Sequence, residues 1–383
     1  MSVKKLIFVV NDAGFFVSHR LPIADAAQKQ GYEIHICTPP NKEQEALFAS
    51  KHFIFHSAPL KRGKRSLIDE IKYIKYLYDL YKYNDFDIIH HVTIKPVLFG
   101  GIAARLAKAK SVVSAISGMG YVFIKQGLKA RLIQTLVIAG YRFAFKQQKH
   151  IAIFQNHDDL ALFIDKKIVN KSDAVLIKGS GVDIEIFKPS TPPKPPITIL
   201  LPARMLWDKG VGEFVEAAAQ VKKQYPNFIF QLAGGVDTEN PAAIKEDQLL
   251  AWQEKGTIQW LGHCRDMITT IQNAHIVCLP SYREGLPKAL IEAMACAKPI
   301  ITTDVPGCKE VVVNNKNGLL VPVKDAIALA NAIVSLAKNS KMLDEMGQES
   351  RKLAENDFSL TIVVEKTLKL YEVLSHESTS NRR

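Results

Sequence analysis

The chain has 383 residues, 47% hydrophobic and 23% charged, with 21 glycines and 18 prolines, which excludes a disordered, collagen-like or low-complexity chain and fits about two globular domains. Five scattered cysteines, none in a Cys-x-x-Cys pair, exclude a disulfide framework and a structural zinc site and favour a reducing, cytosolic compartment. The net charge of +12 lies wholly in residues 1–190, which hold 28 Lys and Arg against 16 Asp and Glu, and this excess favours a polyanionic partner.

The first half alternates short apolar runs with helical patterns. The opening run at residues 6–10 is too short for a signal peptide and predicts a buried first strand, and no window is apolar enough for a transmembrane helix. Strand-helix alternation predicts a doubly wound α/β domain over residues 1–186. The predicted strands are 5–11, 33–39, 53–59, 87–93, 111–117, 150–156 and 173–179, with helices near 19–30, 66–84, 96–108, 127–149 and 157–164.

The alternation stops at a proline-rich run and then begins again. Residues 187–196 end in five prolines within eight residues and predict a stiff linker. A second doubly wound domain is predicted over 197–357, then a helix over 358–375 and a disordered tail over 376–383. Predicted strands are 197–203, 228–234, 257–262, 275–280, 299–303 and 318–321, with helices near 210–224, 242–254, 265–273, 286–296, 325–337 and 359–374.

The most informative motif follows the strand at 275–280. Glu284-Gly285-Leu286-Pro287 reads as a turn from strand to helix, and Glu292 lies about two turns into that helix. Glycine allows close approach of a ligand, and the free N–H groups of the first helical turn favour phosphate. Surface glutamates on helices are common, but this pair brackets Gly-Leu-Pro at a strand-to-helix turn, which indicates a ligand site.

At these residues the chain resembles the retaining nucleotide-sugar glycosyltransferases of family 4, which have the GT-B fold of two Rossmann-like domains facing a cleft. The resemblance implies that the helix at 358–375 crosses back to the first domain. The matching run continues after Glu292 as Ala-Met-Ala-Cys-Ala-Lys-Pro299-Ile. The resemblance implies that Glu284 contacts the hydroxyls of the donor sugar and that Glu292 holds the ribose. It also implies that the turn at Gly285, Leu286 and Pro287 meets the sugar and the diphosphate.

A second cluster opens the first strand-helix unit of the second half. Arg204 and Lys209, five residues apart before a helix, suit a diphosphate, although two solvated cations in a loop would look the same. The resemblance favours diphosphate binding. It also places His263 in the loop that binds the nucleotide base, where backbone groups commonly read uracil, so His263 is a donor-binding rather than a catalytic candidate.

Two segments of the first half are candidates for contact with the acceptor or donor. Gly14 and Phe15 belong to a glycine-aromatic stretch that predicts either an exposed loop at the cleft or a hydrophobic staple on the next helix. His90, Thr93 and Lys95 lie at the end of the strand at 87–93 and are similar to the family's His-x2-Thr-x-Lys-Pro element. We therefore expect Glu284, His90 and Lys95 to take part in catalysis; which of the two adjacent histidines faces the cleft stays open.

No metal or cofactor is expected. Asp85-Phe86-Asp87 has the form of a metal-binding Asp-x-Asp motif but leads directly into a buried strand, so we interpret it as the start of that strand. The expected function is transfer of a hexose or N-acetylhexosamine from a UDP-sugar to a glycan or polyprenyl-diphosphate-linked acceptor. An epimerase of the same fold is one alternative, and a basic nucleic-acid-binding protein is another; neither nucleic acid nor an obligate protein partner is expected.

The basic first half predicts contact with an anionic membrane at the inner face of the plasma membrane. Residues 101–150 contain nine basic residues and no acidic residue. On a helix over 127–149, Arg131, Arg142, Lys146 and Lys149 share one face, and the apolar residues Ile133, Val137, Tyr141 and Ala144 occupy the other. The alternative is a helix that packs on the core with a solvated basic side.

Overall fold

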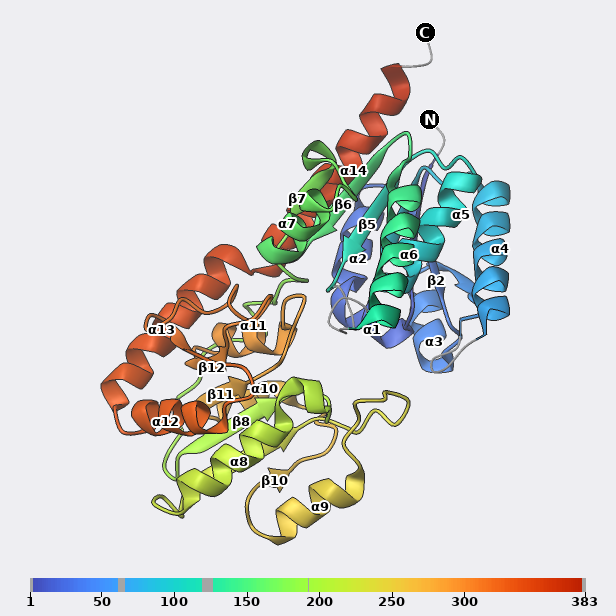
Figure 1. Ribbon diagram of the computed structural model, residues 1–383. Coiled ribbons are helices and arrows are strands. Elements are labelled where there is room, and N and C mark those ends of the chain that lie inside the picture. The colour runs from blue at the N-terminus through green and yellow to red at the C-terminus, as the bar shows by residue number, and fades with distance from the viewer. Residues whose placement is uncertain (1–2, 61–65, 119–126, 192, 381–383) are drawn as a thin grey trace. The chain divides into compact units, whose positions relative to one another are not determined.

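A computed structural model describes residues 3–60, 66–118, 127–191 and 193–380, and the chain forms two compact units (Figure 1). Unit 1 contains Met1–Ser180 and Ile362–Arg383, and unit 2 contains Gly181–Thr361. The chain therefore changes units near 180 and 361, whereas the sequence places the first change in the proline-rich run. The reason is that Arg351 Nη1 donates hydrogen bonds to the carbonyls of Ile184 and Phe187, which fasten the start of that run to unit 2.

Unit 1 is built on a parallel sheet of seven strands in the order β3-β2-β1-β4-β5-β6-β7. This order reverses direction between β1 and β4, as in Rossmann-like domains, and confirms the predicted doubly wound class. Nearly every residue of the central strands is buried, which explains why they read as continuous apolar runs. The strands are β1 (Lys4–Val10), β2 (Tyr32–Thr38), β3 (Ile54–Ser57), β4 (Ile88–Val92), β5 (Val112–Ile116), β6 (His150–Phe154) and β7 (Ala174–Leu176).

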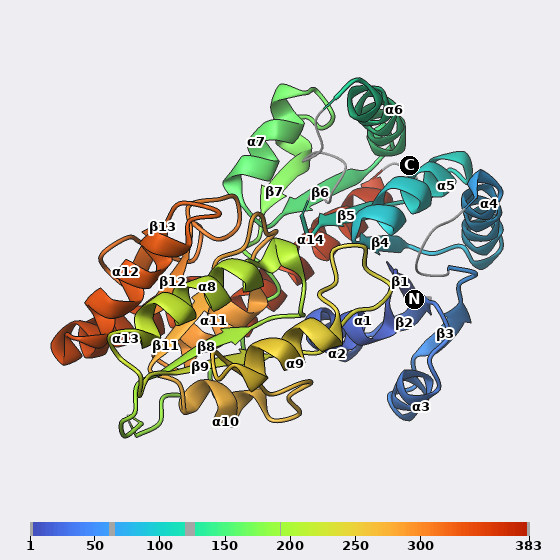
Figure 2. The same ribbon diagram turned by 60° about the horizontal axis from the view of Figure 1, so that its bottom comes forward.

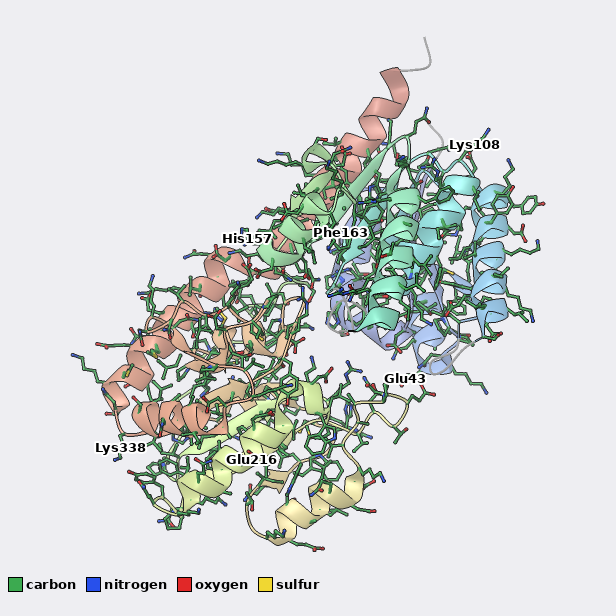
Figure 3. All side chains as sticks on the ribbon, in the orientation of Figure 1. Glu43, Lys108, His157, Phe163, Glu216 and Lys338 are labelled. Carbon is green, nitrogen blue, oxygen red and sulfur yellow. The ribbon has the colours of Figure 1, made fainter. Side chains whose placement is uncertain are left out.

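Helices cover both faces of this sheet. One face packs against α1 (Ala13–His19), α2 (Leu21–Lys29), α3 (Lys42–Ser50) and the C-terminal helix α14 (Leu360–Ser380). The other packs against α4 (Leu67–Asn84), the π-helical turn Pro96–Gly100, α5 (Gly101–Leu106), α6 (Leu128–Phe145) and α7 (His157–Asp165). Side chains fill the space between the sheet and the helices (Figure 3). The ring centroids of Phe163 in α7 and Tyr141 in α6, for example, are 5.4 Å apart.

The return of the C-terminal helix to the first domain is confirmed, because Tyr371 and Leu374 of α14 are buried in the core of unit 1. The helix is longer than expected and continues to Ser380, through part of the segment predicted to be a disordered tail. Residues 381–383 of that predicted tail lie outside the described residues.

Unit 2 repeats the architecture with a six-stranded parallel sheet in the order β10-β9-β8-β11-β12-β13. The order reverses between β8 and β11, so the loops after these two strands meet at the switch point where Rossmann-like sheets bind ligands. The strands are β8 (Thr198–Pro202), β9 (Ile229–Ala233), β10 (Gln259–Trp260), β11 (Ile276–Leu279), β12 (Ile300–Thr303) and β13 (Gly318–Val321). The helices are α8 (Val211–Lys222), α9 (Glu246–Glu254), α10 (Met267–Gln272), α11 (Lys288–Ala295), α12 (Ala326–Ala337) and α13 (Ser340–Asp357).

Three helices, α1, α3 and α13, are not predicted from the sequence. Helix α3 buries only Phe48 and therefore has almost no apolar periodicity. Helix α13 buries Met346, Gly347, Ser350 and Ala354, and a Cβ on Gly347 would lie 2.4 Å from the carbonyl oxygen of Ala297. Glycine at 347 therefore allows the backbones of the helix and of the segment after α11 to approach each other closely.

Candidate functional site

The loops that follow β8 and β11 lie directly against each other in unit 2. Gly210 ends the first loop with φ = +72°, and a Cβ there would lie 2.1 Å from the carbonyl oxygen of Pro280 in the second. The amide of Tyr282 donates a 2.9 Å hydrogen bond to the carbonyl of Asp208, which joins the loops again. Glycine is required at 210 by both the backbone conformation and the lack of space, so the two predicted motifs form one site.

Lys209 and Glu284, one from each loop, form an ion pair whose side chains are 19% and 13% exposed. The hydroxyl of Ser281 donates to the same carboxylate oxygen, Oε1 of Glu284, at 2.8 Å. The backbone of Glu284 is fixed as well, because its amide donates to the carbonyl of Pro306 at 3.1 Å. Glu284 is therefore held as a charged, oriented acceptor of hydrogen bonds at the switch point.

Asp208 lies beside this ion pair. Burial raises the pKa of its carboxyl group; Lys209 and Arg204 oppose this shift, and the negative charge of Glu284 adds to it. Its Oδ1 atom is buried and has no hydrogen-bond partner among the residues that the structure describes. The loop thus places a buried carboxyl group with a raised pKa near two cations, an arrangement typical of functional sites.

Arg204, the other cation of the first loop, reaches away from the ion pair. Its Nη1 atom contacts Oδ2 of Asp237, in the loop after β9, at 2.5 Å, and its side chain is 57% exposed. A Cβ on Gly234 would lie 1.8 Å from the carbonyl oxygen of Ala203, so this third loop is also pressed against the first. Arg204 and Lys209 are brought to one edge of the sheet, and each pairs with a carboxylate.

Glu292 points from the second turn of α11 with its side chain 13% exposed and 3.3 Å from Nζ of Lys288. Burial raises the pKa of its carboxyl group, and Lys288 opposes that shift. The turn before α11 is buried at Gly285, Leu286 and Pro287. A Cβ on Gly307, which has φ = +82°, would lie 2.4 Å from the carbonyl oxygen of Glu284, so the loop after β12 closes tightly over the turn.

His263 is exposed in the loop after β10. His263 lies next to the glycine loop after β9, since a Cβ added to Gly235 would be 3.8 Å from the Cβ atom of His263. The amide of Gly234 donates to the carbonyl of Gly262 at 2.8 Å and joins the two loops. The predicted donor-binding residues therefore lie in loops at the carboxyl end of the same sheet, except Glu292, which lies in α11 directly after one of these loops.

In unit 1, the two histidines of β4 point to opposite faces of the sheet. Nδ1 of His90 lies 2.5 Å from the hydroxyl of Tyr371 in α14, whereas Nε2 of His91 lies 2.9 Å from the hydroxyl of Tyr81 in α4. His90 is 1% and His91 0% exposed. Burial lowers the pKa of both, to about 3 for His91, so both rings are neutral at pH 7.

His90 lies on the face of the sheet that also carries Arg20. Arg20 is a buried residue between α1 and α2, and its positive charge helps to lower the pKa of His90. Its Nε2 atom is buried and has no hydrogen-bond partner among the described residues. A direct role for His90 on substrate stays a prediction. No sequence pattern indicates its partner Tyr371, because 281 positions separate the two residues.

Thr93 and Lys95 follow β4 at the switch point of unit 1. Thr93 has φ = +73°, which is strained for a β-branched residue, and its buried Oγ1 has no partner among the described residues. Lys95 forms a 2.8 Å ion pair with Glu70 of α4, a partner that the sequence did not indicate. Strain and an unpaired hydroxyl at a strand end agree with a binding role for this loop.

The predicted glycine-aromatic loop at Gly14 and Phe15 is wrong: both residues lie in α1. Asp12 caps this helix by accepting a 2.7 Å hydrogen bond from the amide of Phe15. Phe16 is fully buried, and Phe15 stacks on His19 with ring centroids 3.9 Å apart. Phe16 thus packs against the core, which is closer to the alternative prediction of a hydrophobic contact with the helices. Gly14 is exposed on the first turn of α1.

Helix α6 ends at Phe145, so Lys146 caps it and Lys149 lies beyond it, earlier than the predicted end at 149. Tyr141 and Ala144 are buried in the core, as the packing alternative requires. Ile133, assigned to the same face, is instead 51% exposed. Arg131, Arg142 and Lys146 are exposed; Nη2 of Arg142 also donates to the carbonyl of Lys166 at 2.6 Å.

Asp85 and Asp87 have the structural role expected of them. Nζ of Lys110 lies 2.9 Å from Asp85 and 3.0 Å from Asp87, and Asp87 accepts the amide of Lys5 at the start of β1. Over the described ranges, no group of three or more His, Cys, Asp or Glu is arranged to hold a metal ion. Within the same ranges, no helix has both the length and the apolarity needed to cross a bilayer.

Comparison with known proteins identifies both halves of the chain. Residues 5–156 match the family described as "Glycosyl transferase 4-like", and residues 182–353 match "Glycosyl transferases group 1". The fold is similar to that of a sucrose-phosphate synthase from Thermosynechococcus elongatus, with a TM-score of 0.78 at 17% identity over 97% of this chain and 99% of that one.

Two curated relatives are similar over most of their length. One is the N,N'-diacetylbacillosaminyl-diphospho-undecaprenol alpha-1,3-N-acetylgalactosaminyltransferase of Campylobacter jejuni, 29% identical, covering 95% of this chain and 97% of the relative. The other is the UDP-Gal:alpha-D-GlcNAc-diphosphoundecaprenol alpha-1,3-galactosyltransferase of Escherichia coli, 26% identical and covering 80% of each chain.

Proposed function

This chain belongs to the glycosyltransferases of family 4 with the GT-B fold, and we propose that it transfers a hexose or N-acetylhexosamine from a UDP-sugar to a polyprenyl-diphosphate-linked glycan. Both relatives named above act on diphospho-undecaprenol saccharides, and one uses a UDP-sugar. The observation that carries the proposal is the joining of the Arg204–Lys209 loop to the Glu284 turn at the switch point of unit 2. Because polyprenyl diphosphates reside in bilayers, we place the enzyme at the inner face of the plasma membrane.

Each donor group has a matching partner in this arrangement. The diphosphate is bound by Arg204 and Lys209 and by the first amides of α11, where the helix dipole favours negative charge. Glu292, a buried carboxylate on α11, accepts hydrogen bonds from the ribose hydroxyls. Glu284 accepts hydrogen bonds from the sugar, and the loop of His263 contacts the base. Lys209 exchanges part of its contact with Glu284 for the diphosphate as the donor enters.

We propose transfer with retention at the anomeric carbon. The bond between that carbon and the diphosphate oxygen breaks, the bond to the acceptor oxygen forms on the same face, and the acceptor proton passes to the departing diphosphate. Negative charge develops on the UDP oxygen as this happens, so Arg204 and Lys209 stabilise the transition state more than the bound donor. These cations supply the positive charge, and the proposed reaction uses no metal ion.

The test is an assay of the purified protein with UDP-galactose and UDP-N-acetylgalactosamine, each with and without a short-chain prenyl-diphosphate disaccharide acceptor. Mass spectrometry should find an acceptor heavier by one sugar residue, and rates unchanged by a chelator. Conversion of the UDP-sugar to its epimer without acceptor would instead establish the epimerase alternative. Loss of activity with chelator, restored by magnesium, would overturn the metal-independent reaction.

A further inference from the structure

A cavity of about 430 Å³ lies at the amino edge of the unit 1 sheet. Its walls come from the end of α6, the first residue of β6 and the segment between α7 and β7. Helices α6 and α7 lie over β6 and β7 on the same face of the sheet (Figures 1 and 2). Thr93 follows the carboxyl end of β4, so the cavity lies at the opposite edge of the sheet from this predicted site residue. Cavities of this size are typical of small-molecule sites.

Three cations and one carboxylate line this cavity, which gives its lining a net charge of +2. The cations are Arg142, Lys146 and Lys167. Asp173, the carboxylate, is engaged by its own neighbours, because Oδ2 accepts a hydrogen bond from Nδ2 of Asn170 at 2.9 Å and Oδ1 accepts one from Oγ of Ser172 at 2.8 Å. Among the described residues, neither Lys146 nor Lys167 forms an ion pair. The positive charge of the cavity is therefore not balanced by the chain itself.

Basic residues near the end of a helix commonly hydrogen-bond its last carbonyl groups, but other donors do so here. At the end of α6, Nε2 of Gln147 donates to the carbonyl of Ala144 at 2.8 Å. At the end of α7, the backbone amide of Lys167 donates to the carbonyl of Ile164 at 2.8 Å. The ammonium groups of Lys146 and Lys167 are therefore not required as helix caps, and both are available to a ligand.

The floor of the cavity is apolar and aromatic. Its buried lining residues include Phe145, Ile168 and Val169, which are 7%, 4% and 7% exposed. The ring of His150 lies against that of Phe145, with centroids 4.3 Å apart, and its Nε2 atom lies 3.0 Å from the hydroxyl of Ser114. A ligand in the cavity thus meets apolar surface at the floor and exposed cations at the rim.

We propose that this cavity binds a phosphate monoester of a small soluble metabolite, with the phosphate among Arg142, Lys146 and Lys167 and the organic part on the apolar floor. A phosphate monoester carries a charge of about −2 at pH 7, which balances the lining, whereas a phosphodiester carries a single negative charge. Nη2 of Arg142 donates to the carbonyl of Lys166 at 2.6 Å, which fixes the guanidinium at the rim and leaves its other N–H groups for phosphate oxygens.

This site is separate from the reaction proposed above. The donor loops lie in unit 2, and the cavity lies wholly in unit 1, at the sheet edge away from Thr93. A bound phosphate joins the end of α6 to the segment after α7, because its cations come from both. The ligand therefore stabilises the folded form of unit 1, and it is neither the donor nor the acceptor of the transferred sugar.

The experiment is isothermal titration calorimetry of the full chain with glucose 1-phosphate, in the presence of saturating UDP to fill the proposed donor site. The wild type should bind the monoester, and Lys146→Gln/Lys167→Gln should lower the affinity tenfold or more, because two charge-assisted contacts are lost. The matched control is Lys72→Gln/Lys82→Gln, which removes two exposed charges of α4 in the same unit. This control should bind glucose 1-phosphate like the wild type.

Melting temperatures show whether the variants fold. Without ligand, both should melt like the wild type, and glucose 1-phosphate should raise the melting temperature of the wild type and the control but not that of Lys146→Gln/Lys167→Gln. Dimethyl phosphate, a diester like a phospholipid headgroup, should bind at least tenfold more weakly than glucose 1-phosphate, and equal binding would overturn the assignment to a monoester. Equal affinities of the two variants for glucose 1-phosphate, or a wild type that does not bind it at millimolar concentration, would overturn the site itself.

Discussion

Each cation of the 203–210 loop already contacts a carboxylate, Arg204 with Asp237 and Lys209 with Glu284. The two cations differ in environment: Arg204 is 57% exposed, although its partner Asp237 is only 17% exposed, whereas Lys209 is 19% exposed. A mostly exposed ion-pair partner contributes little to stability. We therefore expect Arg204 to act in ligand binding rather than in holding the fold.

Replacing Arg204 with alanine should weaken UDP binding by about 1.5–3 kcal/mol, the range for a charge-assisted hydrogen bond. Isothermal titration calorimetry measures this directly. The matched variant is Asp237→Ala, which removes the competing carboxylate and should bind UDP at least as tightly as the wild type. UDP affinity unchanged by Arg204→Ala would refute the assignment of this residue to the diphosphate.

Glu284→Ala should lower kcat by about a hundredfold or more while changing UDP affinity little, because the carboxylate is assigned to the sugar. Glu292→Gln should show the opposite pattern, with UDP binding weakened because this carboxylate is assigned to the ribose. Steady-state kinetics and calorimetry on both variants separate the two roles. Equal loss of turnover and UDP affinity in Glu284→Ala would give this residue a general structural role.

Among the elements, the strands of unit 1 bury an unusual group of histidines. His90 and His91 of β4 and His150 of β6 are all buried, and burial lowers the pKa of His150 to about 4. An unfolded histidine binds a proton near pH 6.5, whereas these rings stay neutral in the folded unit. The free energy of unfolding is therefore highest above pH 6.5. It decreases as the pH falls from 6.5 toward the pKa that these histidines have in the folded unit.

Unit 1 should therefore lose stability between pH 7 and pH 5, by about 2 kcal/mol for each fully buried histidine. Urea unfolding followed at both pH values measures this loss. The variant His150→Gln can keep a hydrogen bond to Ser114. It should reduce the loss of stability between pH 7 and pH 5 by the contribution of one histidine. An identical pH dependence in this variant would show that His150 does not contribute.

At the scale of the whole molecule, the charge is divided between the units of the fold. The excess of +12 lies in residues 1–190, nearly all of which belong to unit 1, while the donor loops lie in unit 2. Attraction to an anionic membrane and binding of the donor are therefore separable properties. Arg131 and Lys146 are the best test of the first, because Arg142 also holds the carbonyl of Lys166.

Arg131→Gln/Lys146→Gln should weaken binding to anionic vesicles by about 2 kcal/mol, since each basic residue near such a surface contributes about 1 kcal/mol. Flotation at low and at 0.5 M salt measures the loss, which should be largest at low salt. UDP affinity should not change. The control Lys255→Gln/Lys341→Gln removes two charges of unit 2 and should float normally; equal losses in both variants would contradict a specific role for α6.

The doubly wound class and all the strands of both sheets can be predicted from the sequence, because apolar runs buried on both faces and the glycines of strand-to-helix turns encode them locally. The structural role of Asp85 and Asp87 can likewise be predicted from the neighbouring residues. The common role of the Glu284 turn and the Arg204–Lys209 loop, and the return of α14 to unit 1, are predicted only through the resemblance to the family.

Contacts between groups that lie far apart in the chain become known only from the folded structure. Tyr371 reaches His90, Glu70 reaches Lys95, and Asp237 reaches Arg204, and no local pattern marks any of these pairs. The same holds for α6, whose amphipathic pattern is compatible with either a core or a membrane face. The helix uses one apolar side for the core and exposes a second, because its neighbours α5 and α7 cover only part of its circumference.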